Sequence, residues 1–89
     1  MMYRIVTYGR PDERMRGSLV IPNGAVAWAK QVAGVQPEDD GLGEYLLSED
    51  QTRMLAQYLG FKPAPEHFYY YLEPYQAAED TGFQPADAA

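Results

Sequence analysis

The chain has 89 residues, 46% hydrophobic and 22% charged, and this length and composition exclude two independent domains and a disordered or fibrous protein. The absence of cysteine excludes disulfides, thiolate catalysis and a cysteine-based zinc site. The net charge of −6 disfavours binding to nucleic acid phosphates and to anionic membranes.

The charges are unevenly distributed along the chain. Residues 1–16 hold four of the seven basic residues and two acidic ones, a local charge of +2, so residues 17–89 carry −8. The longest uncharged stretch, residues 17–29, is too short to span a bilayer, and arginines interrupt the N-terminal region where a secretory signal needs an apolar run. We therefore expect a cytoplasmic protein that does not enter membranes.

The first elements are predicted to be strands. Residues 3–10 are rich in β-branched and aromatic side chains and end at Gly9 and a Pro-Asp turn signal. A second short strand, residues 18–21, stops at Pro22. Antiparallel pairing of the two places the basic loop 10–16 at the tip of a hairpin.

Two helices are predicted next. Asn23 is suited to cap the first, which ends at Gly34 and has one apolar stripe, made of Ala25, Trp28, Ala29 and Val32. Ser48 and Gln51 have the spacing of a capping box at the start of the second, which ends at Gly60. Its predicted buried stripe is Gln51, Met54, Leu55, Tyr58 and Leu59.

The acidic loop between the helices raises the question of a calcium site. An EF-hand alignment with Gly43 at the sixth position puts Leu42 at the fifth, where an oxygen ligand is needed. Gly41 and Gly43 lack the further glycine and the lysine of a phosphate-binding loop. We therefore predict no metal site and no cofactor.

The last strand is predicted over residues 67–73, within the segment HFYYYLEPY, and ends at Pro74. Residues 76–89 are small, polar and acidic, and we expect a disordered tail after a single domain over residues 1–75. The order ββα(β)αβ, with an optional strand at residues 44–47, predicts an α+β fold. It consists of a small antiparallel sheet of three or four strands with two helices packed on one face.

Strand alternation then predicts which side chains share the sheet face without helices. Phe68, Tyr70 and Leu72 are the more apolar set of the last strand and should face the helices. The opposite face is the predicted partner-binding site, made of Arg4, Tyr8, Arg10, His67, Tyr69 and Tyr71.

Four interpretations of this face are open. Its tyrosines can be purely structural, because cross-strand aromatic pairs stabilise sheets. The leading functional hypothesis is a non-catalytic accessory or regulatory protein that binds a protein partner, or a second copy of itself, through the face. The alternative is binding of a nucleotide or single-stranded nucleic acid. The fourth interpretation is a small enzyme that uses His67, the lone histidine, as its acid-base group.

Overall fold

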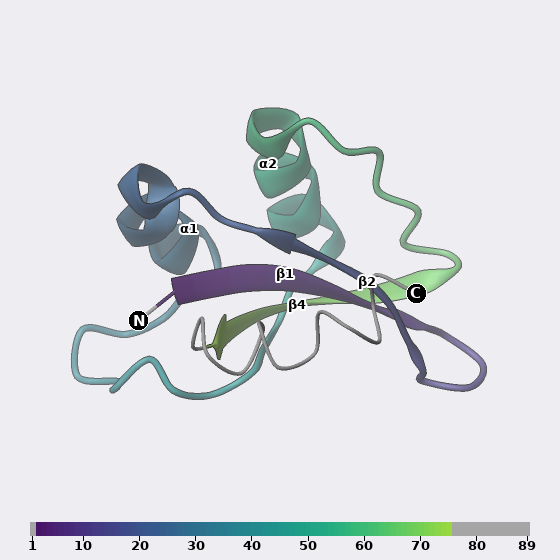
Figure 1. Ribbon diagram of the computed structural model, residues 1–89, viewed down its shortest axis with the longest axis horizontal. Helices are drawn as coiled ribbons and strands as arrows, with labels where there is room; N and C mark the ends of the chain where they lie inside the picture. Colours follow the sequence, from purple (N-terminus) through teal and green to yellow (C-terminus); the bar gives the residue numbers. More distant parts are fainter. Residues whose placement is uncertain (1, 76–89) are drawn as a thin grey trace, which may run out of the picture.

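The fold has two layers, a four-stranded antiparallel sheet and two helices that both lie on one side of it (Figure 1). The computed structural model describes residues 2–75, so the tail predicted over 76–89 lies outside the described residues. The elements are β1 (Met2–Gly9), β2 (Met15–Val20), a 3₁₀ turn (Asn23–Ala25), α1 (Val26–Val32), β3 (Tyr45–Leu46), α2 (Glu49–Leu59) and β4 (Phe68–Tyr75). The predicted α+β class is confirmed, and the optional fourth strand is present.

The centre of the sheet is formed by β1 and β4, in the strand order β2-β1-β4-β3. β1 and β2 form the predicted hairpin, with a register shift between Thr7 and Tyr8. β1 and β4 pair along their whole length, with Ile5 opposite Leu72. β3 adds only two residues at the outer edge of β4.

The hydrophobic core lies between the sheet and the helices. β1 contributes Tyr3 and Ile5, and β4 contributes Tyr70 and Leu72, so the predicted alternation of both strands is correct. The other buried members of the core are Ile21, Ala25, Ala29, Leu47 and Leu55. Phe61, just after α2, stacks on Tyr70 with ring centroids 5.9 Å apart.

The predicted ends of α2 are confirmed, but its predicted buried stripe is partly wrong. Ser48 and Gln51 form the capping box, and Gly60 ends the helix at φ 83°. Leu55 is fully buried as predicted, whereas Met54 and Tyr58 are 52% and 61% exposed. The residues buried in α2 are Thr52, Leu55 and Ala56.

The buried residues of α2 share one side of the helix. Thr52, Leu55 and Ala56 lie at i, i+3 and i+4, with the partly buried Leu59 at i+7, whereas Met54 and Tyr58 lie on an adjacent, exposed side. The Thr52 hydroxyl donates a hydrogen bond of 2.7 Å to the Ser48 carbonyl, which satisfies a polar group that is otherwise buried.

The start of the first helix also differs from the prediction. Asn23 makes no side-chain cap and instead begins the 3₁₀ turn that leads into α1. The apolar stripe is present, with Ala25 and Ala29 buried. Trp28 is only partly buried and packs against the exposed Tyr58 of α2, with ring centroids 5.1 Å apart.

β4 begins one residue later and ends two residues later than the predicted strand. His67 is in the turn before it, where the backbone N–H groups of His67 and Phe68 donate to the Ala64 carbonyl. At the other end, Pro74 is inside the strand, opposite Tyr3. The Tyr3 carbonyl accepts from the Ile21 N–H, so the backbone polar groups of Tyr3 point toward β2 and away from β4. Tyr3 and Pro74 are therefore a non-hydrogen-bonded pair, and the missing N–H of the proline costs no bond to β1.

The acidic loop is fixed to the sheet at Gly41. The Tyr3 hydroxyl donates to the Gly41 carbonyl at 2.6 Å, and Gly41 has a φ of 74°. An added Cβ would lie 2.5 Å from the Tyr3 hydroxyl oxygen. We therefore expect Gly41→Ala to lower the free energy of unfolding by about 1–2 kcal/mol, because the alanine is strained and displaces Tyr3.

Urea denaturation measures this change, and Gly43→Ala in the same loop is the matched control. A Cβ at Gly43 meets its nearest neighbour at 3.6 Å, an ordinary contact, and φ there is not positive. An equal loss of stability in the two variants would show that Gly41 has no special conformational role.

Candidate partner-binding site

Four of the six predicted site residues lie together on the sheet face opposite the helices. Tyr8 pairs with Tyr69 across β1 and β4, and residues Arg4 and Tyr71 share their side of the sheet. We call this the tyrosine face and define it by Arg4, Val6, Tyr8, Tyr69, Tyr71 and Glu73. In the described part of the chain, both helices are on the other face (Figure 1).

The tyrosine face has its own packed layer. The Tyr8 ring meets the Tyr71 ring edge to face, with centroids 5.4 Å apart, and its hydroxyl donates to Glu73 Oε2 at 2.8 Å. This bond runs along the strands, from the cross-strand pair Tyr8–Tyr69 to the cross-strand pair Arg4–Glu73. Val6 lies between those pairs and is fully buried. The position of the Tyr8 ring is therefore fixed at both ends.

Burial sets the protonation of this contact. The pKa of Glu73 is raised, mainly because its carboxyl is desolvated, although the bond from Tyr8 and the charge of Arg4 act in the opposite direction. The pKa of Tyr8 is raised to about 12 by burial and by the bond to Glu73. Tyr8 therefore keeps its proton at neutral pH and acts as the donor.

A cavity of about 450 Å³ opens on the tyrosine face. Its walls are Tyr8, Tyr69 and Tyr71, and its remaining lining residues are Glu13 and Glu44. Glu13 comes from the turn between β1 and β2, and Glu44 comes directly before β3. The cavity therefore combines aromatic walls from two central strands with carboxylates from two loops.

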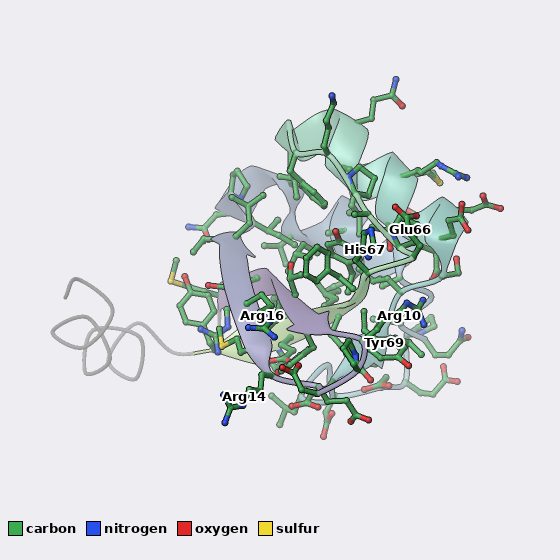
Figure 2. All side chains as sticks on the ribbon, turned by 90° about the vertical axis from the view of Figure 1, so that its right-hand side faces the viewer. Arg10, Arg14, Arg16, Glu66, His67 and Tyr69 are labelled. Carbon is green, nitrogen blue, oxygen red and sulfur yellow. The ribbon has the colours of Figure 1, made fainter. Side chains whose placement is uncertain are left out.

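Arg10 lies at the end of the sheet, beside the tyrosine face. Its guanidinium is 4.3 Å from the centroid of the Tyr69 ring, and its Nε donates to the Pro65 carbonyl at 2.5 Å. Figure 2 shows Arg10 and Tyr69 together at this end of the molecule. Arg10 lines a second cavity, of about 530 Å³, which reaches to the start of α2. Tyr69 lines both cavities and separates them.

The prediction for His67 is wrong in position, because the strand begins one residue later. His67 is exposed in the turn before β4, next to Glu66 (Figure 2), and its ring is 6.3 Å from that of Phe68. It is among the lining residues of neither cavity. The geometry therefore gives no support to His67 as an acid-base catalyst, which would need an enclosed ligand and a second titratable group.

The carboxylates of the cavity were not predicted as site residues. Glu13 belongs to the basic hairpin loop, and Glu44 is an acid at the start of the optional strand, residues 44–47. One local feature of the sequence indicates that Glu44 lies near the site: it directly precedes the short strand β3, which pairs with β4 and so brings Glu44 to the edge of β4. No sequence pattern indicated Glu13.

Within residues 2–75, no group of three or more histidine, cysteine, aspartate or glutamate side chains could hold a metal ion. None of the helices in this part of the chain has the length and apolar character needed to cross a membrane.

The fold and the site together define a small α+β domain with a tyrosine-walled, carboxylate-edged cavity on its helix-free sheet face. The chain belongs to the family described as Domain of unknown function (DUF7683), which matches residues 2–73. This match spans all of the elements described above except the last two residues of β4. Comparisons with curated proteins and with solved structures found no match.

Proposed function

We propose that this protein is a non-catalytic accessory or regulatory module of the cytoplasm that binds a protein partner through its tyrosine face. The observation that supports this most strongly is the open cavity walled by Tyr8, Tyr69 and Tyr71 on the face without helices. Tyrosine is enriched at the energetic centres of protein interfaces because it combines a large apolar ring with a polar hydroxyl.

The preorganisation of the face supports the same proposal. Tyr8 is held by its ring contact with Tyr71 and by its bond to Glu73, and Arg10 stacks on Tyr69. Side chains that are already fixed lose little conformational entropy when a partner binds, so more of the contact energy appears as affinity.

The nucleic acid alternative has weaker support. Glu13 and Glu44 line the cavity, and Glu73 lies behind it, so phosphates would meet carboxylates. The basic side chains of the original prediction, Arg4 and Arg10, lie against the rings of Tyr75 and Tyr69. Neither arginine lines the cavity on the tyrosine face, so a phosphate bound there would meet carboxylates without a basic partner.

A photo-cross-linking amino acid at Ser18 tests the proposal. Ser18 is exposed and pairs with Val6, so it lies beside the tyrosine face, whereas Met54 is exposed on α2 and serves as the control position. We expect a covalent adduct with one protein from Ser18 but not from Met54. The identified partner is then purified, and its affinity is measured for the wild type and for the double variant Tyr69→Ser, Tyr71→Ser.

The double variant should lose affinity by at least about tenfold, as expected when interface tyrosines are truncated. Tyr58→Ser removes an exposed tyrosine from α2, on the other side of the sheet, and should leave affinity unchanged. Ser18→Arg blocks the face without removing a packed ring, so it tests the proposal even if the double variant unfolds. Unchanged affinity in the folded face variants would overturn the proposal, and a doubled mass in light scattering that these variants abolish would assign the face to self-association instead.

A further inference from the structure

The chemistry of the cavity on the tyrosine face is that of a cation site. Aromatic faces attract a cation through the ring quadrupole, and nearby carboxylates supply opposite charge. Three rings and two carboxylates, those of Glu13 and Glu44, line the cavity. The basic side chains on this face do not line it, which leaves the cavity itself with acidic and aromatic groups only.

The protein already uses the tyrosines of β4 to hold its own arginines. The Arg10 guanidinium lies 4.3 Å from the ring centroid of Tyr69, and the Arg4 guanidinium lies 5.1 Å from that of Tyr75. Tyr71 lies between these two tyrosines on the same side of the strand, and its ring forms a wall of the cavity. The cavity therefore lies between two tyrosines of β4 that each hold a guanidinium group against the ring.

The hairpin turn between β1 and β2 brings the Glu13 carboxylate to the cavity. Glu13 has a φ of 55° and is the only residue other than glycine with positive φ in the described part of the chain. Its backbone N–H donates to the Gly9 carbonyl, so this left-handed conformation belongs to the tight turn itself. The turn therefore places a second carboxylate, in addition to that of Glu44, at the edge of the cavity.

We propose that the cavity binds an arginine side chain presented by a basic segment of the partner, an inference that rests on the proposed function. Arginine fits better than lysine because its planar guanidinium stacks on rings and donates in a fork to carboxylates. The protein's own residues 76–89 contain neither lysine nor arginine and cannot supply this group.

The surrounding charges are compatible with an incoming cation. The cavity lining itself carries two carboxylates, those of Glu13 and Glu44, and no basic group. Of the arginines nearby, Arg4 and Arg10 lie against tyrosine rings, and Arg16 pairs with Asp12 in the hairpin loop. The net charge of −6 on the whole chain favours encounter with a basic partner.

The test uses the full chain and two probes, N-acetylarginine amide and N-acetylcitrulline amide, which have nearly the same shape but differ in charge. NMR titration should show shifts of the amide signals of Glu44, Tyr69 and Tyr71 with the arginine probe, at an affinity of about millimolar, as expected for so small a ligand. Glu44→Gln and Glu13→Gly should each weaken binding by roughly threefold to fivefold. Glu38→Gln, an exposed acid of the same loop outside the cavity lining, should change nothing.

Equal binding of citrulline, tighter binding of N-acetyllysine amide, or shifts confined to other surfaces would overturn the arginine assignment. So would the absence of any shift at probe concentrations well above millimolar. If the arginine probe fails but the cross-linked partner still depends on Tyr69 and Tyr71, the cation inference is wrong and the proposed function stands. If both fail, the tyrosine face is not the binding surface.

Discussion

Replacing Leu72 with alanine is expected to lower the free energy of unfolding by about 2–5 kcal/mol, the usual range for truncating a buried leucine. Leu72 is fully buried at the centre of β4, opposite Ile5 of β1 and Tyr45 of β3. Its removal leaves a cavity that the sheet on either side prevents from collapsing. Urea denaturation followed by circular dichroism measures the change.

Leu46→Ala is the matched control for this experiment. Leu46 comes from the neighbouring strand β3 and pairs with Tyr71, but 56% of it is exposed. We expect its substitution to change stability by less than about 1 kcal/mol. If Leu72→Ala does not fold at all while Leu46→Ala folds normally, the expected order is already observed. The reverse order would mean that the core is not where the structure places it.

Tyr8→Phe is expected to destabilise the protein by about 1.5–3 kcal/mol at neutral pH, the range for hydrogen bonds to charged groups. The substitution retains the ring that covers Val6 but removes the hydroxyl that donates to Glu73. Glu73 is only 6% exposed, so water replaces the lost donor poorly. Tyr69→Phe is the control, because it removes a hydroxyl from the same face without removing this bond.

The burial of Glu73 predicts a pH dependence of stability. Desolvation of its carboxyl raises the pKa of Glu73 in the folded state above its ordinary value of 4.5, so the folded protein binds this proton more tightly than the unfolded chain. The contribution of Glu73 to stability is therefore fully present below pH 4.5 and is lost as the pH rises through the higher folded value.

Glu73→Gln isolates this contribution, because glutamine still accepts the bond from Tyr8 but does not titrate. The difference in stability between Glu73→Gln and the wild type should grow in favour of the variant as the pH is raised from about 4 to 7, where Glu73 ionises. Thermal melts across this range measure the difference. A constant difference would show that Glu73 has the same pKa in the folded and unfolded states.

The parts of the fold that follow from local chemistry could be predicted from the sequence. Ser48, Gln51 and Gly60 bound α2 because capping depends on residues three apart and on one left-handed position. The alternation of β1 and β4 was also predictable, because apolar residues select the core side. The burial of Thr52 and Ala56 was not, because it depends on how closely α2 approaches the sheet and on a bond to the Ser48 carbonyl.

The site residues on strands were predictable, because side chains alternate between the two faces of a strand. The site residues in loops were not, because the backbone conformation of a loop decides where its side chains lie. Tyr8, Tyr69 and Tyr71 share a face because each lies on a strand of known phase. His67 was misplaced because a turn closed by the Ala64 carbonyl comes before the strand. Glu13 reaches the cavity through a left-handed turn residue, a conformation that the sequence of the loop does not indicate.

The pairing of β1 with β4 also governs the order in which the molecule can assemble. These strands are the first and last elements of the described chain, yet they form the middle of the sheet. Contacts between such distant segments require closure of a long loop and slow the folding of small domains. During synthesis, Ile5 therefore lacks Leu72, its partner on β4, until β4 has left the ribosome. A chain that stopped before residue 68 would contain both helices but lack Tyr70 and Leu72, which belong to the core that the helices cover.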